Sequence, residues 1–191
     1  MSRFKDKAQR ISNWWLVLFG KLSNNREFME IIEKELDELG YFDAPASTKY
    51  HLNYEGGLYE HSCNVTDALL CLTKDMGLEW SRPQSPYIIG MFHDLCKADA
   101  YMRNEELDFP PYKYNNDTLY KGHGEKSVLM LASILRLTGE EIACITYHMG
   151  AFTDKEKWSD YTNAIHKYPN VLWTHTADMI ATHILEVEND A

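Results

Sequence analysis

The chain has 191 residues, 45% of them hydrophobic, and a formal net charge of -10. This length suits one sizeable domain, and the lack of repeats, Pro-rich tracts and blocks of like charge excludes a long disordered arm. The negative charge argues against a broad grip on nucleic acid, because phosphate backbones are held mainly by lysine and arginine. We therefore expect a small substrate, and bound cations as the local source of positive charge.

The most apolar stretch near the start is WWLVLFG, residues 14–20. It is far shorter than the roughly 20 residues of a membrane span, and no small-residue cleavage site of a secretory signal follows it. We expect it to lie in the core or at a dimer interface of a cytoplasmic protein without membrane contact, so a homo-oligomer is left open. The four cysteines form no CxxC pair and are expected to be reduced, mostly buried thiols: Cys63, Cys71, Cys96 and Cys144.

Helical hydrophobic patterns dominate the first part of the chain. One helix is predicted over residues 25–40 and ends at Gly40; its buried face consists of Phe28, Ile31, Ile32, Leu36 and Leu39. A second helix is predicted over residues 56–77; its buried stripe consists of His61, Val65, Ala68, Leu69 and Leu72. His61 is therefore expected to point into the interior.

The segment SPYIIGMFHDLCKADAY, residues 85–101, is apolar almost all round and begins with the helix-start residues Ser85 and Pro86. It is predicted to be a central helix. His93 and Asp94 stand side by side within this run, where burial of an unpaired polar group would cost about 2–7 kcal/mol. Something must compensate the pair, and a metal ion is one candidate.

The second half of the chain is predicted to hold one hairpin and four helices. The hairpin, over residues 109–122, would turn at NND, with Tyr112 and Tyr114 before the turn and Leu119 and Tyr120 after it. Helices are expected over 122–139, 140–150, 154–169 and 170–190. In the first of them Val128, Leu131 and Leu135 would be buried and Gly139 would end the helix, and the third would lie on the surface. The last would be capped by Asn170, and one face would carry Val171, His175, Asp178, Ala181, Thr182 and Leu185. The predicted architecture is all-α with one short β-hairpin.

Six polar residues from five segments are predicted to point inward: His61, His93, Asp94, His123, His148 and Asp178. Imidazole and carboxylate ligands suit divalent Mn, Fe, Co, Ni or Zn, and no cysteine falls into this set. Each residue alone is more often a hydrogen-bonded core residue, and His175 with Asp178 could simply be an i, i+3 helix pair. His51 and His183 are expected to be structural or exposed, and His166 to lie on the surface.

Five blocks in this order, EGGLYEHSCNV, MFHDLCK, GHGEKS, YHMG and HTADMIA, resemble the HD-domain metal-dependent phosphohydrolase superfamily. Residues 41–62 resemble in particular the catalytic HD domain of 3'-to-5' exoribonucleases, and also small stand-alone HD proteins of bacteria and phages. The resemblance implies an HD-type helical bundle. Residues 1–191 would form a single domain, with N-terminal helices in 1–40 and the catalytic core in 41–187.

The resemblance also implies roles for individual residues. His61, His93, Asp94 and Asp178 would hold a first metal, with Asp94 able to bridge, and His123 and His148 would complete a second site. The cofactor would be one or two divalent ions: Mn, Fe, Co, Ni, Zn or Mg. Such ions lower the pKa of bound water to about 7, so a metal-bound hydroxide would attack the phosphoryl group.

Three further positions bear on this implied chemistry. Lys97, one turn beyond His93, would hold a phosphate oxygen and act with Asp94 in catalysis; some nucleotidase branches have a glutamate there. Two-metal branches often read HH where this chain has His148-Met149. Glu125 and Lys126 are weaker candidates for orienting water or phosphate.

The leading functional hypothesis is a metal-dependent phosphohydrolase of nucleotide-type phosphate esters, including small phosphodiesters. Two alternatives are a 3'-to-5' exonuclease on single-stranded ends and a non-hydrolysing HD sensor that binds a nucleotide. Specificity is expected to lie in the loops at 41–57 and 105–122.

Overall fold

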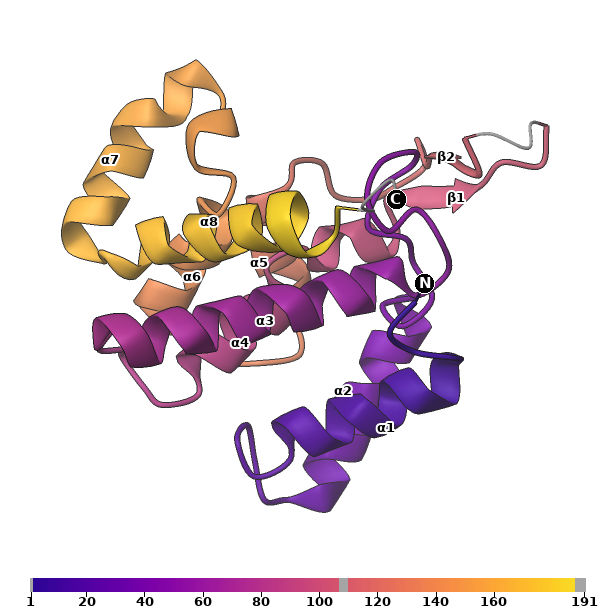
Figure 1. Ribbon diagram of the computed structural model, residues 1–191, viewed down its shortest axis with the longest axis horizontal. Helices are drawn as coiled ribbons and strands as arrows, with labels where there is room; N and C mark the ends of the chain where they lie inside the picture. The colour runs from indigo at the N-terminus through magenta and orange to yellow at the C-terminus, as the bar shows by residue number, and fades with distance from the viewer. Residues whose placement is uncertain (1, 107–109, 188–191) are drawn as a thin grey trace.

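The computed structural model describes residues 2–106 and 110–187 and is mostly helical, as predicted (Figure 1). The α-helices are α1 (Lys7–Leu18), α2 (Arg26–Glu38), α3 (Gly57–Met76), α4 (Ser85–Phe92), α5 (Gly124–Ala132), α6 (Gly139–Thr146), α7 (Trp158–Lys167) and α8 (Asn170–Ile180). Short 3₁₀ turns span Leu95–Ala98, Gly150–Phe152 and Lys155–Lys157, and α8 continues into a π-helical turn, Ala181–Leu185. Strands β1 (Tyr101–Arg103) and β2 (Tyr112–Tyr114) pair antiparallel.

Helix α3 lies at the centre and packs against both α4 and α8. The contact with α4 is close, because a Cβ added at Gly90 would lie 2.5 Å from Thr66 Oγ1. A side chain at position 90 would push the two helices apart, so this glycine sets the distance between the helices that carry His61 and His93.

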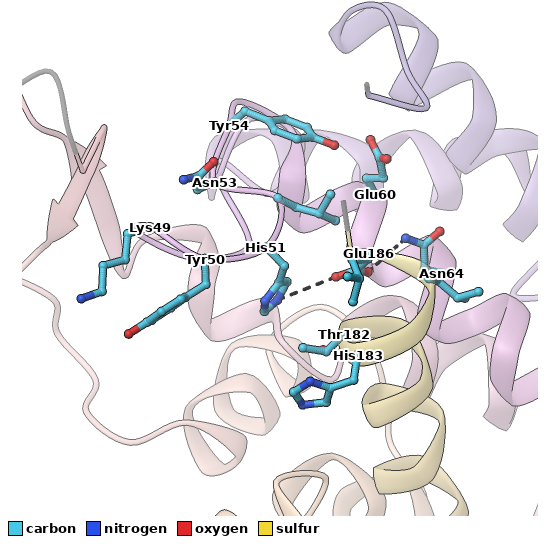
Figure 2. Close-up of a pocket in the computed structure, with 13 residues that line it drawn as sticks. Lys49, Tyr50, His51, Asn53, Tyr54, Glu60, Asn64, Thr182, His183 and Glu186 are labelled. Atoms are coloured by element: carbon cyan, nitrogen blue, oxygen red, sulfur yellow. Dashed lines mark hydrogen bonds and ion pairs between the residues drawn. The ribbon is translucent and has the colours of Figure 1, made fainter. Parts of the chain in front are cut away.

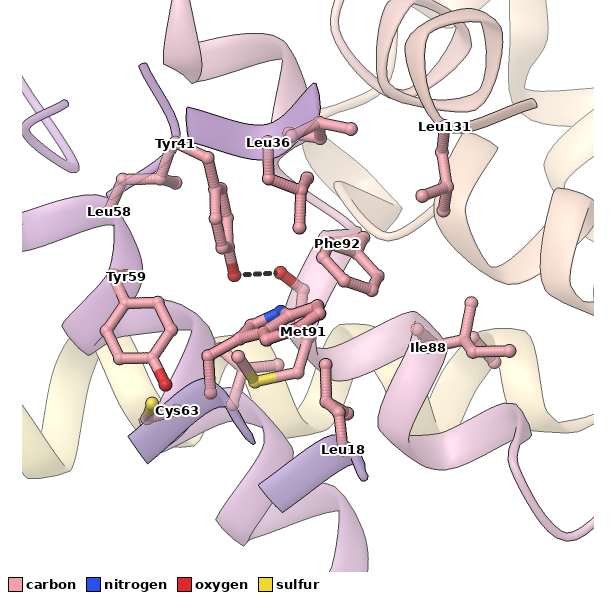
Figure 3. Packing of buried hydrophobic residues seen from close by; sticks show 14 of the residues in the cluster. Leu18, Leu36, Tyr41, Leu58, Tyr59, Cys63, Ile88, Met91, Phe92 and Leu131 are labelled. Carbon is pink, nitrogen blue, oxygen red and sulfur yellow. Dashed lines mark hydrogen bonds between the residues drawn. The ribbon is translucent and has the colours of Figure 1, made fainter. Parts of the chain in front are cut away.

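The N-terminal helices share one hydrophobic cluster with α3 and α4 (Figure 3). Trp14, Leu18 and Leu36 are fully buried in it. The Tyr41 hydroxyl, beyond the end of α2, donates a hydrogen bond of 2.6 Å to the Met91 carbonyl oxygen. Of the apolar stretch at 14–20, Trp14 and Leu18 lie in the core as expected, whereas Leu16 and Phe19 are 81% and 44% exposed.

Helix α1 also holds the segment that leads into α3. Arg10, only 3% exposed, places its guanidinium 3.2 Å from both Asp43 and Glu55. Gly56, with φ +81°, lets the chain turn directly against that guanidinium. The segment between Asp43 and Gly56 is therefore anchored at both ends.

Several predicted boundaries and faces are wrong. In α2 the buried face is Met29, Ile32 and Leu36, whereas Phe28 and Ile31 are 38% and 54% exposed. The stripe follows i, i+3 and i+7; Phe28 lies at its edge, and Ile31 lies toward the solvent-facing side of the helix.

The predicted helix over 85–101 ends at Phe92, and its last part is the 3₁₀ turn and β1. The β2 strand was expected, but its partner is β1 and not the segment after NND, so the predicted hairpin register is wrong.

The predicted helix over 122–139 stops at Ala132, and Gly139 begins α6 instead of ending a helix. Thr138 caps α6 through a capping box with Glu141, a signal at TGEE that the sequence reasoning missed. Asn170 does not cap α8: it is buried and donates to the Glu79 carbonyl oxygen and to Glu140. The amphipathic α7 has no buried residue, as expected of a surface helix.

The cysteine side chains and the length of the apolar helices bear on two further expectations. All four cysteines are free; Cys71 is exposed and the other three are buried, as predicted. Within the described residues, no helix is long and apolar enough to cross a membrane.

Candidate metal centre

The predicted inward-pointing histidines and aspartates converge beside the C-terminal end of α4. His93 is the C-cap residue directly after the last helical residue, Phe92, and Asp94 follows it in the turn before the 3₁₀ segment. Helix α3 contributes His61, α8 contributes Asp178, and the ends of α5 and α6 contribute His123 and His148. The structure therefore brings all six predicted residues into one cluster.

The Asp94 carboxylate, 2% exposed, is the centre of this cluster. Its Oδ1 lies 2.9 Å from His123 Nε2 and 3.3 Å from His148 Nε2. Its Oδ2 lies 2.7 Å from Lys97 Nζ, 3.5 Å from His61 Nε2 and 3.6 Å from His93 Nε2. Burial alone would raise the pKa of this carboxyl, but the positive charge of Lys97 and the surrounding imidazoles hold it well below its ordinary value. Asp94 is thus a carboxylate.

One set of donors lies on the Oδ2 side of Asp94. The Nε2 atoms of His61 and His93 are 3.3 Å apart, and His61 Nε2 is 3.3 Å from Asp178 Oδ1. Burial lowers the pKa of His93 to about 4, so this imidazole is neutral. Its Nδ1 lies 2.9 Å from the Gly90 carbonyl oxygen and donates to it, which leaves the Nε2 lone pair facing the cluster.

His61 is the proton-binding member of this set. Burial lowers its pKa, but hydrogen bonds to Asp178 and Glu186 outweigh burial and raise the pKa to about 9. A proton on Nε2 therefore sits among a nitrogen lone pair and two carboxylates. The same convergence of nitrogen and oxygen donors would suit a divalent cation in place of that proton.

The second set lies on the Oδ1 side of Asp94. His148, fully buried, directs Nδ1 at the Ile145 carbonyl oxygen at 2.7 Å, so its Nε2 faces Asp94 as an acceptor. Among the described residues His148 Nε2 has no hydrogen-bond partner, and Asp94 Oδ1 has no well-aligned one, although the protonated His123 Nε2 lies 2.9 Å from it. Two buried acceptors held 3.3 Å apart repel each other, and a cation between them would relieve that cost. This observation fits a second ion position.

The close packing of α5 on α6 places these two histidines. A Cβ at Gly124 would lie 2.2 Å from the Thr146 carbonyl oxygen, so only glycine allows this approach. His123, immediately before Gly124, keeps a side chain that is 35% exposed. Burial lowers its pKa, but the charge on Asp94 outweighs burial and raises the pKa to about 10.

Cys96 belongs to the cluster, contrary to the expectation that no cysteine would. Its buried Sγ lies 3.2 Å from His123 Nδ1. Asp94, Cys96 and His123 offer ligand atoms that all lie within 4.8 Å of one another. The position of Cys96 two residues after Asp94 was the one sequence signal for this contact.

Glu186 is a second residue that the sequence reasoning missed. Both of its carboxylate oxygens contact His61 Nδ1, at 2.9 and 3.1 Å, and Asn64 Nδ2 donates to Oε1 at 3.0 Å. The side chains of Glu186 and His61 are each 1% exposed. A carboxylate that accepts from one imidazole nitrogen fixes the ring so that the other nitrogen faces a metal.

The remaining candidates have different surroundings. His175 Nδ1 donates to the His148 carbonyl oxygen at 2.8 Å, so it supports a cluster member, and no ion pair joins it to Asp178 within the described parts of the chain. Glu125 pairs with Lys157. Lys126 pairs with Asp99. Both residues are engaged in ion pairs, and their role in orienting water or phosphate stays a prediction.

A cavity of about 850 Å³ adjoins the cluster (Figure 2). Glu186 and Thr182 are part of its wall, and Thr182 Oγ1 lies 3.3 Å from Asp178 Oδ1. His51, expected to be structural or exposed, also lines the cavity; its Nε2 is 3.8 Å from Glu186. Burial, together with the charges of His61 and Lys97, lowers the pKa of His51 to about 4, so the imidazole is neutral.

Over part of its length, the chain is similar to a dihydroneopterin 2',3'-cyclic phosphate phosphodiesterase from Methanocaldococcus jannaschii, with 39% identity over 80 residues. The match covers 39% of this chain and 31% of that protein, so the chain spans about a third of the length of this relative. No family model matches the chain, and no solved structure does.

Proposed function

We propose that this protein is a metal-dependent phosphohydrolase of the HD-domain type, acting on small phosphate esters of the nucleotide class. One observation carries the proposal: a buried carboxylate, Asp94, stands among four imidazoles, and its Oδ1 faces His148 Nε2 without a hydrogen bond. Buried polar groups without partners mark places where an ion or ligand completes the structure. Six imidazole and carboxylate side chains in one cluster are typical of a metal centre.

Two ion positions follow from the two sides of Asp94. A first ion would be held by His61, His93, Asp94 and Asp178, and a second by Asp94, His123 and His148. A bound divalent cation supplies Lewis acidity, which polarises a phosphoryl oxygen and lowers the pKa of water. The ligand types allow Mn, Fe, Co, Ni, Zn or Mg.

Lys97 is the residue of this chain that we assign to phosphate. Its Nζ lies 2.7 Å from Asp94 Oδ2, and the nearby carboxylate raises the pKa of the ammonium despite burial. The side chain is still 13% exposed, so one of its three N–H donors can reach a substrate oxygen. Lys97 would orient the phosphate and offset part of its negative charge.

The similarity to a cyclic phosphate phosphodiesterase supports phosphodiesters as part of the substrate range. The net charge of -10 supports small substrates over nucleic acid. We therefore place nucleoside 2',3'-cyclic phosphates beside nucleoside mono- and triphosphates as candidates, and we rank exonuclease activity second.

The test is hydrolysis after chelator treatment and reloading with each metal in turn. The substrates are nucleoside mono- and triphosphates, nucleoside 2',3'-cyclic phosphates and a single-stranded oligonucleotide, with products separated by chromatography. We expect metal-dependent cleavage of at least one small ester, which Asp94→Ala abolishes. The control Asp67→Ala changes an exposed aspartate on α3 that pairs with Arg3, and it should remain active.

Three outcomes would contradict the proposal. Cleavage of the oligonucleotide alone would indicate the exonuclease. Tight nucleotide binding without product would indicate the sensor. Absence of hydrolysis and of bound metal, whichever ion is supplied, would mean that the cluster is a structural hydrogen-bond network.

A further inference from the structure

We infer that the cavity beside the His61–Glu186 pair receives the organic group of the phosphate ester, and that this group is a planar nitrogen heterocycle. The inference rests on the proposed function, because it names the substrate part that the same site would hold. The wall that carries the argument consists of Tyr50, His51, Asn53, Thr182, His183 and Glu186.

The position of the cavity connects it to the metal centre. Glu186 lines the cavity with one edge and contacts His61 Nδ1 with its carboxylate. Thr182 also lines the cavity, and its Oγ1 donates to Asp178 Oδ1 at 3.3 Å. Glu186 and Thr182 therefore border both the cavity and the cluster, so an ester whose phosphate lies at the metal would extend its organic group past these two side chains into the cavity.

The size of the cavity excludes a phosphate-only site. Its volume of about 850 Å³ lies within the roughly 300–1,000 Å³ typical of small-molecule pockets. Inorganic phosphate would leave most of this space to water. The space suits a substrate with a ring system attached to the phosphate.

The lining offers an exposed aromatic ring and an amide group without hydrogen bonds to the described parts of the chain. Lys49 Nζ lies 5.1 Å from the centroid of the Tyr50 ring, and Tyr50 is 72% exposed, so most of the ring is accessible for stacking (Figure 2). Within the described residues, no hydrogen bond engages the side chains of Tyr50, Asn53 or His183. An asparagine amide offers both donors and an acceptor, which match the edge of a nitrogen heterocycle.

The acidic groups of the lining are already satisfied. Glu60 accepts from Ser2 Oγ and from the Arg3 N–H. Glu186 accepts from His61 and Asn64. Within the described part of the lining, no carboxylate is therefore left without a partner to select a cationic ligand, and the unused groups favour a neutral, hydrogen-bonding ring.

The turn that carries Tyr50 and His51 is fixed before any ligand arrives. Ser47 Oγ accepts from the Tyr50 N–H at 2.9 Å and donates to the His51 carbonyl oxygen at 2.8 Å. Leu52 has φ 46°, in the left-handed region that leucine rarely adopts. Such a preformed turn lowers the entropy lost on binding.

The experiment compares two cyclic phosphodiesters that differ in the ring. Guanosine 2',3'-cyclic phosphate carries a heterocycle, whereas glycerol 1,2-cyclic phosphate does not. In the metal-loaded enzyme, Tyr50→Ala should raise KM for the guanosine ester about tenfold relative to KM for the glycerol ester, a size typical of a lost base–aromatic stack. Tyr50→Phe should retain the wild-type ratio, and Tyr120→Ala, which changes an exposed tyrosine outside the cavity lining, should do so too.

A binding measurement separates this inference from the proposed function. Calorimetry with guanosine, which has no phosphate, and chelator-stripped protein should show binding that Tyr50→Ala and Asn53→Ala weaken. Guanosine binding with no hydrolysis of any ester would support the cavity assignment and contradict the enzymatic proposal. Hydrolysis of both esters with equal KM, unaffected by Tyr50→Ala, would overturn the cavity assignment and leave the phosphohydrolase intact.

Discussion

Replacing Glu186 with glutamine should weaken metal binding without unfolding the protein. The carboxylate contacts His61 Nδ1 through both oxygens, at 2.9 and 3.1 Å, and both side chains are 1% exposed. Glutamine has nearly the same shape and keeps one acceptor, but it loses the negative charge. His61 would then be a poorer donor to the metal, because the charge on its carboxylate partner raises the basicity of the imidazole.

The expected size of the effect follows from the burial of this pair. Hydrogen bonds to charged groups are worth about 1.5–3 kcal/mol, and loss of a carboxylate behind a metal-ligating histidine typically costs 10–100-fold in affinity. Tenfold corresponds to about 1.4 kcal/mol, so the two ranges agree. We expect Glu186→Gln to lower the affinity of the first ion about 10–100-fold, measured by competition with a chromogenic chelator.

A matched control makes this measurement decisive. Glu60 is also buried and lines the same cavity, but its carboxylate accepts from Ser2 and Arg3 and contacts no candidate ligand. Glu60→Gln should therefore keep wild-type metal affinity. If Glu186→Gln binds metal as tightly as the wild type, while circular dichroism shows the native helix content, Glu186 does not orient His61 for an ion.

Three more predictions follow from the same geometry. Removal of the metal should lower the melting temperature, because an ion at a hundredfold excess over its Kd adds about 2.7 kcal/mol; equal melting curves for stripped and reloaded protein would contradict this. Lys97→Ala should raise KM or lower kcat while metal content stays at the wild-type level by elemental analysis, and loss of metal would show that Lys97 serves only as the partner of Asp94. Burial alone would raise the pKa of Glu141, but hydrogen bonds from Arg82 and from the Thr138 N–H outweigh burial and lower the pKa from 4.5. The ionised group therefore stabilises the fold above pH 4.5, and this contribution is lost as the pH falls through the lowered value. Glu141→Gln should flatten the acid limb of a stability–pH curve from chemical unfolding, and an unchanged limb would refute the assignment.

The site residues could be predicted because each lies on a strongly patterned segment. The hydrophobic stripe of α3 places His61 inward, and His93 follows an uninterrupted apolar run in α4. Five sequence blocks in a fixed order then suggested that the segments meet. The structure brings these residues together, and their role as metal ligands stays a prediction.

Boundaries were harder to predict because tertiary contacts decide them. The apolar run from residue 85 continues through Leu95 and Cys96, so the pattern does not show that the helix ends at Phe92. At Asp94 the backbone has left the α-helical conformation, with φ -105° and ψ 20°, and the carboxylate contacts Lys97 and imidazoles from other segments. The β1 strand was hidden in the tail of the same run, and its pairing with β2 depends on a connection that no local pattern specifies.

Glu186 was missed for a related reason. Its contact with His61 joins residues 125 positions apart, and a glutamate near the end of a helix ordinarily faces solvent. The π-helical turn after α8 brings it back toward α3. One extra residue in a helical turn shifts the direction of every later side chain, and hydrophobic periodicity does not reveal such a shift.

The charges of the cluster explain how His93 and Asp94 can be buried at the end of α4. Asp94, Asp178 and Glu186 carry three negative charges, since their pKa values are all lowered. Lys97 and the protonated imidazoles of His61 and His123, with pKa values of about 9 and 10, carry three positive charges. Without a metal ion the charges of this cluster sum to zero, because the Lys97 ammonium and the protons on His61 and His123 balance the three carboxylates.

Metal binding would exchange ions for the two imidazole protons. His61 would have to lose its proton to hold the first ion and His123 to hold the second, so each ion replaces one proton and adds one net positive charge to the cluster. Metal affinity should then fall steeply as the pH is lowered, because protons compete for both nitrogens. Either a proton or an ion would compensate the buried Asp94 carboxylate, so competition between the two would be the signature of a metal centre in this apolar run.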